Sequence, residues 1–387
     1  MTKGHIRQRG GKRGVATWEL KFDADRAEGG RQTVYRSFKG SKREAQAELT
    51  RLLAQAQAGE YVEPSKLSVV DYVRSRIKQW HASGTISQKT SERYEELATY
   101  QLGRFAIGSR PLQKLTAADI EAWHNELKTS GRQRGDGGVS TQTISHAHRL
   151  LSSALRDAVR FGFVLRNVAS EQRPPKIVKK AMEILSPEQV RALPTLLAGR
   201  PICVPAMVGL FCGLRRGELL ALHWDDVDFT RKTIRVRAAL EYTLAHGVRF
   251  KEPKTKSGKR VIVLPDITVT ALHDHRREQL EMRVKLGLGK APDNALVFPA
   301  PGTEQPWNPE AFSFTWLNVS SELGLGVSFH ALRHTHASML ISLGTPITEI
   351  AHRLGHASPT TTLSVYSHLY EKDNSKAAAA INAALGG

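Results

Sequence analysis

The spacing of apolar residues changes along this chain of 387 residues, and that change limits the possible folds more than any other feature. Between Val15 and Phe38 apolar and polar residues alternate around a Gly-rich break, which is typical of a small sheet. Ser41 then begins a helical pattern that ends near Gly59. From Leu67 to Glu171 the pattern is helical almost throughout. The first part of the chain therefore predicts a small sheet with one helix, followed by a helical domain.

The last helix of that helical domain has the clearest pattern. Ser140 is a good N-cap, and Gly162 is a good end signal. Its expected buried face carries Ile144, Leu151, Leu155 and Val159. Beyond it, Arg173–Lys180 has a Pro-Pro step and three lysines but little periodicity. We therefore predict a linker between domains at this point.

The region after the linker mixes helices and strands. A helix is expected over Pro187–Leu197, and the apolar run Pro201–Leu214 predicts a buried core helix. Both cysteines, Cys203 and Cys212, lie in that run and are expected to behave as small buried apolar residues. The strands expected further along are Ile234–Tyr242, Val248–Lys251 and Val261–Leu264.

A hairpin turn is predicted at Ser257 and Gly258, between the last two of these strands. Its tip would carry Lys254, Lys256, Lys259 and Arg260. The fold class that follows is a multidomain protein, mainly α with small β-sheets. The predicted boundaries are 1–62 for the sheet-plus-helix domain, 63–172 for the helical domain, 173–184 for the linker, 185–370 for a mixed α+β domain and 371–387 for an alanine-rich C-terminal tail helix.

The charge of the chain indicates a polyanionic partner. It has 56 Lys and Arg against 37 Asp and Glu, a formal net charge of +19 and a pI near 10.0. Such a positive field favours nucleic acid first and a membrane surface second, and it is hard to explain in an enzyme of small molecules. No stretch reaches the roughly 20 apolar residues of a spanning helix, and the basic N-terminus lacks the apolar core of a secretory signal. We therefore expect a cytoplasmic protein that binds no membrane.

The segment Ser328–His336 carries the clearest candidate chemistry. Ser328 is a credible N-cap, and the helix after it places His330 and Arg333 on one face. A histidine that exchanges a proton beside a guanidinium suits a phosphate whose charge grows in a transition state. A zinc site at His330 and His334 is an alternative, but the glutamate of the metalloprotease motif is missing because Ala331 follows His330.

Two other places carry candidate residues. Arg215 and Arg216 end the buried apolar run, where an arginine costs free energy unless an anion binds it. Periodicity alone leaves open which of the two faces a phosphate. Near the C-terminus one helix stops at Gly355, the next begins at Ser358, and Tyr366 lies about two turns into it. These helices also fit a helix-turn-helix regulator of DNA, which explains the charge but not the His–Arg pair upstream.

Taken together, these residues resemble the tyrosine recombinases of the phage integrase family. The resemblance rests on Gly213-Leu214-Arg215, Lys256 at the predicted hairpin, His330-Ala331-Leu332-Arg333, Leu354-Gly355-His356, and Tyr366 ten residues beyond His356. Their occurrence together in this order is highly specific. The N-terminal sheet and helix resemble the family's arm-binding domain, and the helical middle resembles its core-binding domain.

The resemblance implies a site-specific recombinase, or integrase, that cleaves and rejoins DNA through a 3′-phosphotyrosine. The implied catalytic set is Arg215, Lys256, His330, Arg333, His356 and Tyr366. Tyr366 is the implied nucleophile, and the two arginines would bind the nonbridging oxygens of the scissile phosphate. His330 and His356 would add hydrogen bonds, with His330 the expected proton acceptor from the tyrosine.

Lys256 would protonate the departing 5′ oxygen, although Lys254 and Lys259 compete with it on the sequence alone. Glu218, one helical turn after Arg215, is expected to orient that arginine. The acidic group Asp225, Asp226 and Asp228 suggests a two-metal nuclease as an alternative. Because these residues fall in a helix-to-strand loop typical of the family, we predict neither a metal nor a cofactor, and a reaction independent of ATP.

Basic residues outside the catalytic set are expected to bind DNA, with an ordinary solvated surface as the alternative for each. In the sheet-plus-helix domain they are Arg7, Arg9, Lys12, Arg13, Arg36 and Lys39; in the helical domain they are Lys89, Arg93 and Arg149. A separate basic N-terminal module favours a recombinase that bridges arm-type and core-type sites over a strand-relaxing topoisomerase.

The expected assembly is a homotetramer on double-stranded DNA, with accessory DNA-bending or directionality proteins as further partners. The tail is expected to pack on a neighbouring subunit, or alternatively on its own. We expect the protein to act on the nucleoid of a bacterial host and to integrate or excise a mobile element such as a phage genome.

Overall fold

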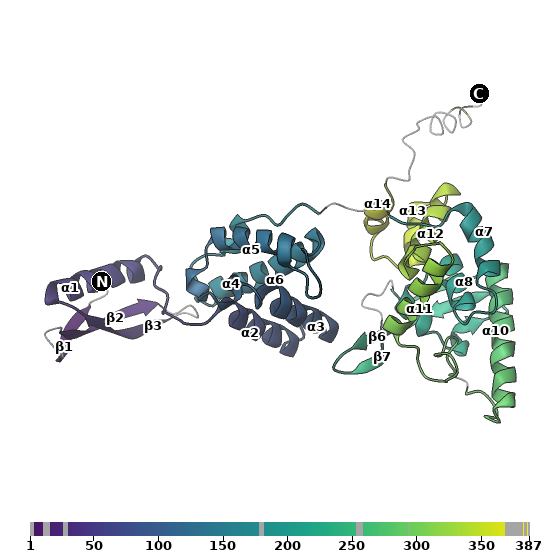
Figure 1. The fold of residues 1–387 in the computed structure, drawn as a ribbon, viewed down its shortest axis with the longest axis horizontal. Coiled ribbons are helices and arrows are strands. Elements are labelled where there is room, and N and C mark those ends of the chain that lie inside the picture. Colours follow the sequence, from purple (N-terminus) through teal and green to yellow (C-terminus); the bar gives the residue numbers. More distant parts are fainter. Residues whose placement is uncertain are drawn as a thin grey trace. The chain divides into compact units, whose positions relative to one another are not determined.

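A computed structural model describes residues 4–10, 16–25, 30–177, 182–252, 258–292 and 294–367, together with Asn382 and Leu385. The chain forms two compact units, Met1–Lys179 and Lys180–Gly387. Figure 1 shows the helices and strands of each unit. The predicted tail helix and the residues Lys12, Arg13, Lys254 and Lys256 lie outside the described residues.

The first unit begins with an antiparallel sheet covered by one helix. The strands β1 (His5–Gly10), β2 (Thr17–Asp25) and β3 (Arg31–Lys39) follow in spatial order, and α1 (Lys42–Gln57) packs on one face. Ser41 caps α1 in a reciprocal pair of hydrogen bonds with Glu44, as its position predicted. β1 was not predicted, because its sequence is polar apart from Ile6 and does not alternate.

The rest of the first unit is helical, as predicted. Its elements are α2 (Val69–Ala82), α3 (Gln88–Leu97), a π-helical turn (Ala98–Leu102), α4 (Ala106–Ser109), a 3₁₀ turn (Leu112–Lys114), α5 (Ala117–Ser130), α6 (Thr141–Arg160) and a 3₁₀ turn (Val168–Glu171). Ser140 caps α6, and Gly162 just beyond it has a φ of 71°. Val159 was expected on the buried face but is exposed, because the buried stripe steps from Leu155 to Ala158 instead.

The second unit surrounds a buried apolar helix with other helices and two small sheets. Its helices are α7 (Pro187–Leu196), α8 (Cys203–Cys212), α9 (Arg216–Leu220), a 3₁₀ turn (Trp224–Asp226), α10 (Asp266–Lys285), α11 (Pro309–Glu322), α12 (Phe329–Ser342), α13 (Ile347–Leu354) and α14 (Pro359–Tyr366). α8 packs against α10 and α12, which confirms the predicted core helix. Cys212 is buried and Cys203 half-buried, and both are free thiols.

The strands of the second unit differ from the prediction. One sheet has the order β4 (Val227–Asp228), β5 (Thr233–Val236), β8 (Arg260–Val263), and β6 (Ala239–Thr243) forms a second sheet with β7 (Gly247–Lys251). The predicted strand Ile234–Tyr242 is therefore two strands, which separate beside Arg237, whose side chain binds Asp225 and Asp226. The predicted pairing of Val248–Lys251 with Val261–Leu264 in a hairpin is wrong, because β7 and β8 belong to different sheets. Ser257, at the predicted turn, lies outside the described residues.

The predicted fold class, multidomain and mainly α with small sheets, is confirmed. Separate apolar clusters fill the sheet-plus-helix part, the helical part and the second unit. The domain boundaries themselves stay a prediction. Among the described residues, no helix combines the length and the apolar character needed to cross a membrane.

Candidate active site

The C-terminus of α8 places the first arginine of the site. Gly213 ends this helix in the left-handed conformation, with a φ of 66°. A Cβ added at Gly213 would lie 2.6 Å from Cδ2 of His336 and 2.9 Å from Cδ2 of Leu354. The position therefore requires glycine for both its backbone conformation and its packing. The chain then turns, and Arg215 is the N-cap residue of α9.

The C-terminus of α13 holds three arginines through three successive carbonyl groups. Arg260 donates from Nε to the Arg353 oxygen at 2.7 Å. Arg333 donates from Nη2 to the Leu354 oxygen at 2.6 Å, and Arg215 donates from Nη2 to the Gly355 oxygen at 3.2 Å. The last carbonyls of a helix have no partner inside the helix and carry its negative dipole end. This helix end therefore gathers positive charge at one place.

Arg333 is the most deeply buried of the predicted basic residues of this site, with 3% of its surface exposed. It donates from Nη1 to the Gly213 oxygen at 2.6 Å and from Nη2 to the Leu354 oxygen and to Nε2 of His356. Within the described parts of the chain, no carboxylate lies in ion-pair contact with it. Burial, and then the charge of Arg215, lower the pKa of Arg333 to about 9. A buried cation without an anionic partner is a candidate binding site for an anion.

Glu218 links two of the arginines and is itself 4% exposed. Its carboxylate accepts from Arg215 Nη1 at 2.7 Å and from Arg260 Nη2 at 2.9 Å. Burial alone would raise its pKa, but hydrogen bonds and charges from Arg260 and Arg215 hold the pKa of Glu218 below its ordinary value. Glu218 therefore stays ionised, and the contact with Arg215 expected from the sequence is present. It fixes that side chain, which is 39% exposed.

Arg215 and Arg216, which the sequence left as alternatives, have different partners. Arg216 turns away to α11, where its Nη1 donates to Ser313 Oγ at 2.5 Å. Arg215 instead reaches the carbonyl of Gly355 beside His356. Of the competing lysines, Lys259 is exposed and paired with Glu252 at 2.9 Å. Lys256 lies outside the described residues, so its role stays a prediction.

His356 is joined to Arg333 and to α14. Its Nε2 lies 3.0 Å from Arg333 Nη2, and its Nδ1 lies 2.7 Å from Thr362 Oγ1. A guanidinium only donates, so Nε2 accepts and the ring proton is on Nδ1, from where it is donated to the threonine. Burial, and then the charge of Arg333, lower the pKa of His356 to about 4. The ring is therefore neutral at pH 7.

Tyr366 is buried at the end of α14, with 1% of its surface exposed. Its ring packs in an apolar cluster with Ala337, Ile341, Ile350 and Leu354. Burial raises the pKa of its phenol to about 12, against a smaller lowering by Arg333. The hydroxyl oxygen lies 2.6 Å from Nδ1 of His334. Sequence reasoning had weighed His334 only as a zinc ligand and had assigned the tyrosine's proton to His330.

His330 lies one helical turn before His334 on α12. It is exposed, and its ring meets the ring of His334 edge-on with 4.7 Å between centroids. Packing of protein around it, and then the charges of His334 and Arg333, lower the pKa of His330 to about 4. With His334 bonded to Tyr366, this pair does not converge on a common ligand point as a zinc site requires.

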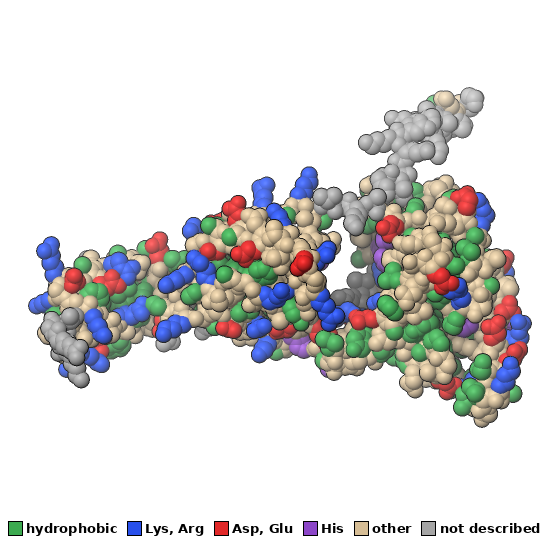
Figure 2. All heavy atoms as spheres, in the orientation of Figure 1, with side chains coloured by type: hydrophobic (Ala, Val, Ile, Leu, Met, Phe, Trp, Pro, Cys, Tyr) green, Lys and Arg blue, Asp and Glu red, His purple; other side chains and the backbone are tan. Residues whose placement is uncertain are grey.

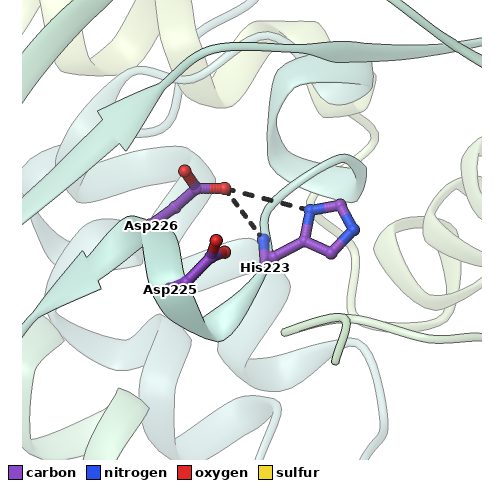
Figure 3. Close-up of side chains that lie close together, drawn as sticks. All are labelled: His223, Asp225 and Asp226. Carbon is purple, nitrogen blue, oxygen red and sulfur yellow. Dashed lines mark hydrogen bonds and ion pairs between the residues drawn. The ribbon is translucent and has the colours of Figure 1, made fainter. Parts of the chain in front are cut away.

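The acidic group weighed as a two-metal site is explained by neighbouring protein groups. His223, Asp225 and Asp226 lie close together, and the backbone N–H of His223 donates to Asp226 Oδ2 at 3.1 Å (Figure 3). Arg237 binds both carboxylates, at 2.6 Å to Asp225 and 2.8 Å to Asp226. Asp228 accepts from the backbone N–H of Arg231. A guanidinium therefore already occupies the place between the carboxylates that a cation would need.

The predicted DNA-binding residues of the sheet fall on two faces. Arg7 pairs with Glu19 across the strands, and Lys39 pairs with Thr17, so both belong to the face opposite α1. Arg36 pairs with buried Leu20 and is half-buried on the α1 face, where it is less available to DNA. Lys and Arg side chains project from the surface of this unit (Figure 2). Arg9 is exposed and carries an ion pair with Glu19 at 2.5 Å.

Two of the three predicted residues of the helical part lie near each other. Arg93 on α3 and Arg149 on α6 both lie close enough to His146 for their charges to affect it. Burial lowers the pKa of His146, and the charges of Arg149 and Arg93 lower it further. Arg93 is also paired with Glu96 at 2.6 Å, and Lys89 precedes it by one turn on the same helix. His146 was not predicted, since a single histidine on a helix gives no sequence signal.

Comparisons with known proteins found similar chains. Residues 180–373 match the model of the phage integrase family. A XerC-like tyrosine recombinase of Caldanaerobacter subterraneus subsp. tengcongensis is 26% identical over 287 residues, covering 69% of this chain and 71% of that protein. The Tn1549 transposon integrase, solved with a circular intermediate DNA, superposes with a TM-score of 0.67 at 21% identity, covering 82% of this chain and 99% of the other. A lambda integrase tetramer bound to a Holliday junction gives a TM-score of 0.54 at 18% identity, covering 92% of this chain and 96% of the other.

Proposed function

The chain belongs to the phage integrase family, and from that premise we propose a role for each residue of the site. It is a tyrosine recombinase, an enzyme that cleaves and rejoins DNA strands. In our proposal Tyr366 attacks the scissile phosphate while Arg215 and Arg333 bind its nonbridging oxygens. The observation that carries this is the buried guanidinium of Arg333, which has carbonyl partners but no carboxylate partner among the described residues and lies beside a second arginine. An anionic phosphate would complete these surroundings.

The arginines would act by preorganised electrostatics. Negative charge grows on the nonbridging oxygens as the tyrosine attacks, and guanidinium donors fixed by carbonyl groups need no rearrangement to meet it. His356 is neutral and oriented by Thr362, so it would add to this frame by holding Arg333 in place. Glu218 would keep Arg215 and Arg260 in place without touching DNA.

The reaction would need neither a metal nor ATP. The Tyr366 oxygen forms a bond to phosphorus as the bond to the 5′ oxygen breaks, and Lys256 would protonate that departing oxygen. The products are a 3′-phosphotyrosine and a free 5′ hydroxyl. Because the new ester conserves the energy of the broken one, a second DNA hydroxyl can reverse the step and join to another strand.

The larger assembly follows from the basic surfaces and from the relatives. We assign residues 1–62 to arm-type DNA sites, 63–172 to core-type sites, 173–184 to the linker and 185–370 to catalysis. The lambda relative was solved as a tetramer on a Holliday junction, and a homotetramer on two duplexes is our proposal for this chain. Such an enzyme would integrate or excise a mobile element at the nucleoid of a bacterial host, together with accessory DNA-bending or directionality proteins.

A covalent-trapping assay tests the proposal. Wild-type protein and Tyr366→Phe are incubated with a nicked duplex that contains the junction sequence of the mobile element carrying this gene. The reaction contains a chelator and no added metal. We expect a protein–DNA band on a denaturing gel for the wild type and none for the variant, with equal DNA binding. If neither protein forms the band while both bind the DNA, the chain is a helix-turn-helix regulator and the proposal is wrong.

A further inference from the structure

We infer that His334, rather than His330, accepts the proton of Tyr366 when the tyrosine attacks phosphorus. The inference rests on the proposed function, in which Tyr366 is the nucleophile, and it adds a catalytic residue that the sequence motif did not supply. Geometry comes first for a general base, since it must lie within hydrogen-bond reach of the proton that it removes. The Nδ1 atom of His334 lies 2.6 Å from the Tyr366 oxygen.

The two histidines occupy successive turns of one face of α12. His330 and His334 are four residues apart, and Ala337 and Ile341 continue the same stripe. Ala337 and Ile341 pack in the apolar cluster that holds the Tyr366 ring. His334 is therefore the polar residue of this stripe that lies next to the cluster, whereas His330 lies a turn further away and is exposed. The helix itself fixes which histidine meets the tyrosine.

The direction of the hydrogen bond follows from the protonation of both groups. The buried phenol keeps its proton at pH 7, because burial raises the pKa of Tyr366 to about 12. Burial, and then the charge of Arg333, lower the pKa of His334, so its imidazole is neutral. The phenol therefore donates to Nδ1, and the ring's own proton is on Nε2. The acceptor is already aligned with the proton that must leave.

His330 is placed to serve the phosphate side instead. Its ring is exposed and touches His334 edge-on, and within the described parts of the chain it makes no hydrogen bond to protein. Burial is the largest cause that lowers the pKa of His330, and His334 and the positive charges of Arg333 and Arg215 lower it further. A neutral imidazole at the open edge of this arginine cluster is available to donate to a phosphate oxygen. His334 would then accept the proton of the nucleophile, and His330 would donate to the phosphate.

The proton and electron balance of the step is complete. A lone pair of the Tyr366 oxygen forms the bond to phosphorus while its proton moves to Nδ1 of His334, which becomes an imidazolium. The electrons of the breaking bond go to the 5′ oxygen, which takes a proton from Lys256 in the proposed function. In the rejoining step the imidazolium returns its proton to the tyrosine as that oxygen leaves phosphorus.

A structural explanation competes with this inference, because a buried phenol usually has a hydrogen-bond partner whether or not it reacts. Two substitutions separate the explanations. His334→Ala removes both the acceptor and the base. His334→Asn keeps a polar group near the position of Nδ1 but cannot take a proton. His352→Ala is the matched control, since His352 is exposed on α13.

The measurement is the first-turnover rate of covalent-complex formation on the nicked duplex, with and without millimolar imidazole. General-base catalysis typically contributes on the order of 10²-fold or more. We therefore expect His334→Ala and His334→Asn both to be slowed by about 100-fold or more at saturating DNA, and His352→Ala to match the wild type. Imidazole should enter the space left in His334→Ala and accelerate it by about tenfold or more, without accelerating Tyr366→Phe.

The result that overturns the inference is near-wild-type cleavage by either His334 variant, or a slow His334→Ala protein that folds, binds DNA and ignores imidazole. Thermal melting and DNA binding of each variant identify a folding defect, and His334→Asn keeps the test decisive if His334→Ala is unstable. Failure of the proposed function has a different signature, because the wild type itself would then form no covalent complex that depends on Tyr366.

Discussion

Two pairs of arginines, one pair in each unit, are held in opposite ways. In the first unit Arg9 and Arg93 are exposed and pair with carboxylates at the surface, Arg9 with Glu19 and Arg93 with Glu96. In the second unit Arg333 and Arg260 are buried and bound by backbone carbonyls at the ends of α8 and α13. Arg260 also has Glu218, whereas Arg333 has no carboxylate among the described residues.

This difference separates arginines suited to binding DNA from arginines suited to the cleavage reaction. A surface ion pair contributes about 0 to 1 kcal/mol, so exposed arginines can exchange a carboxylate for a DNA phosphate at little cost. Arginines held by carbonyl groups keep their positions before, during and after the reaction, as electrostatic catalysis requires. Substitutions in the second unit should therefore change the rate of cleavage, and those in the first unit should change binding.

Arg333→Ala should give the largest effect. It removes the buried guanidinium and leaves the carbonyls of Gly213 and Leu354 without their donor. Loss of one preorganised donor to a growing charge typically costs about 10² to 10³-fold in rate. We expect a fall of about 10³-fold in first-turnover cleavage at saturating DNA, with DNA binding changed by less than about threefold. A loss confined to binding would remove the distinction between the two units.

Glu218→Gln should give the next largest effect. The substitution keeps the size of the side chain but removes the charge that fixes Arg215 and Arg260. We expect cleavage to slow by about 10 to 100-fold, since misplaced catalytic groups carry penalties of that order. The matched control is Glu188→Gln, because Glu188 forms an exposed pair of the same spacing with Arg191. Equal effects of the two substitutions would contradict a positioning role for Glu218.

A smaller effect is expected from pH in the helical part of the first unit. His124 and His148 are buried together, with 3.2 Å between their nitrogens. Burial lowers the pKa of His124 to about 4 and also lowers the pKa of His148. Their ordinary value is about 6.5, so the unfolded chain takes up protons below that pH while the folded protein stays neutral. Their contribution to stability is therefore complete above about pH 6.5 and is lost as the pH falls toward 4.

Hydrogen exchange of peptides from α5 and α6 in the full chain measures this effect. We expect the free energy of opening to fall by about 1 to 3 kcal/mol between pH 7 and pH 4. The double variant His124→Leu and His148→Leu should lose most of that dependence. A wild-type profile with no change over this range would show that the pair does not titrate as described.

The smallest effect is expected for Arg7→Ala in the first unit. Arg7 lies on the exposed face of the sheet, where one phosphate contact contributes little to a charged surface. We expect binding to arm-type DNA to weaken by about two- to fivefold at 0.15 M salt. The slope of the logarithm of the binding constant against the logarithm of salt concentration should become smaller by about one. Cleavage of core-only DNA should not change. An effect on cleavage equal to that of Arg333→Ala would contradict the proposal that first-unit residues affect binding and second-unit residues affect cleavage.

The sequence predicted the elements whose signals are local. Ser41, Ser140 and Ser328 cap their helices because a hydroxyl beside the first turn is a local solution to unpaired N–H groups. The helix of α8 followed from an uninterrupted apolar run. The family resemblance rested on short motifs that are read directly along the chain.

What the sequence did not predict depends on contacts between distant segments. Tertiary contacts decide that β5 pairs with β8 and β6 with β7, so the predicted pairing of β7 with β8 was wrong. The bond between His334 and Tyr366 joins residues 32 positions apart, on α12 and α14. The contact of Arg216 with Ser313 joins residues 97 positions apart, on α9 and α11.

The most direct test of the central claim is to identify the residue that carries the DNA. The covalent complex formed on nicked duplex would be digested with nuclease and protease, and its peptides analysed by mass spectrometry. We predict a 3′-phosphonucleotide on the peptide that contains Tyr366, attached at that tyrosine. A nucleotide on any other residue, or a covalent complex that persists in Tyr366→Phe, would contradict the assignment of Tyr366 as nucleophile.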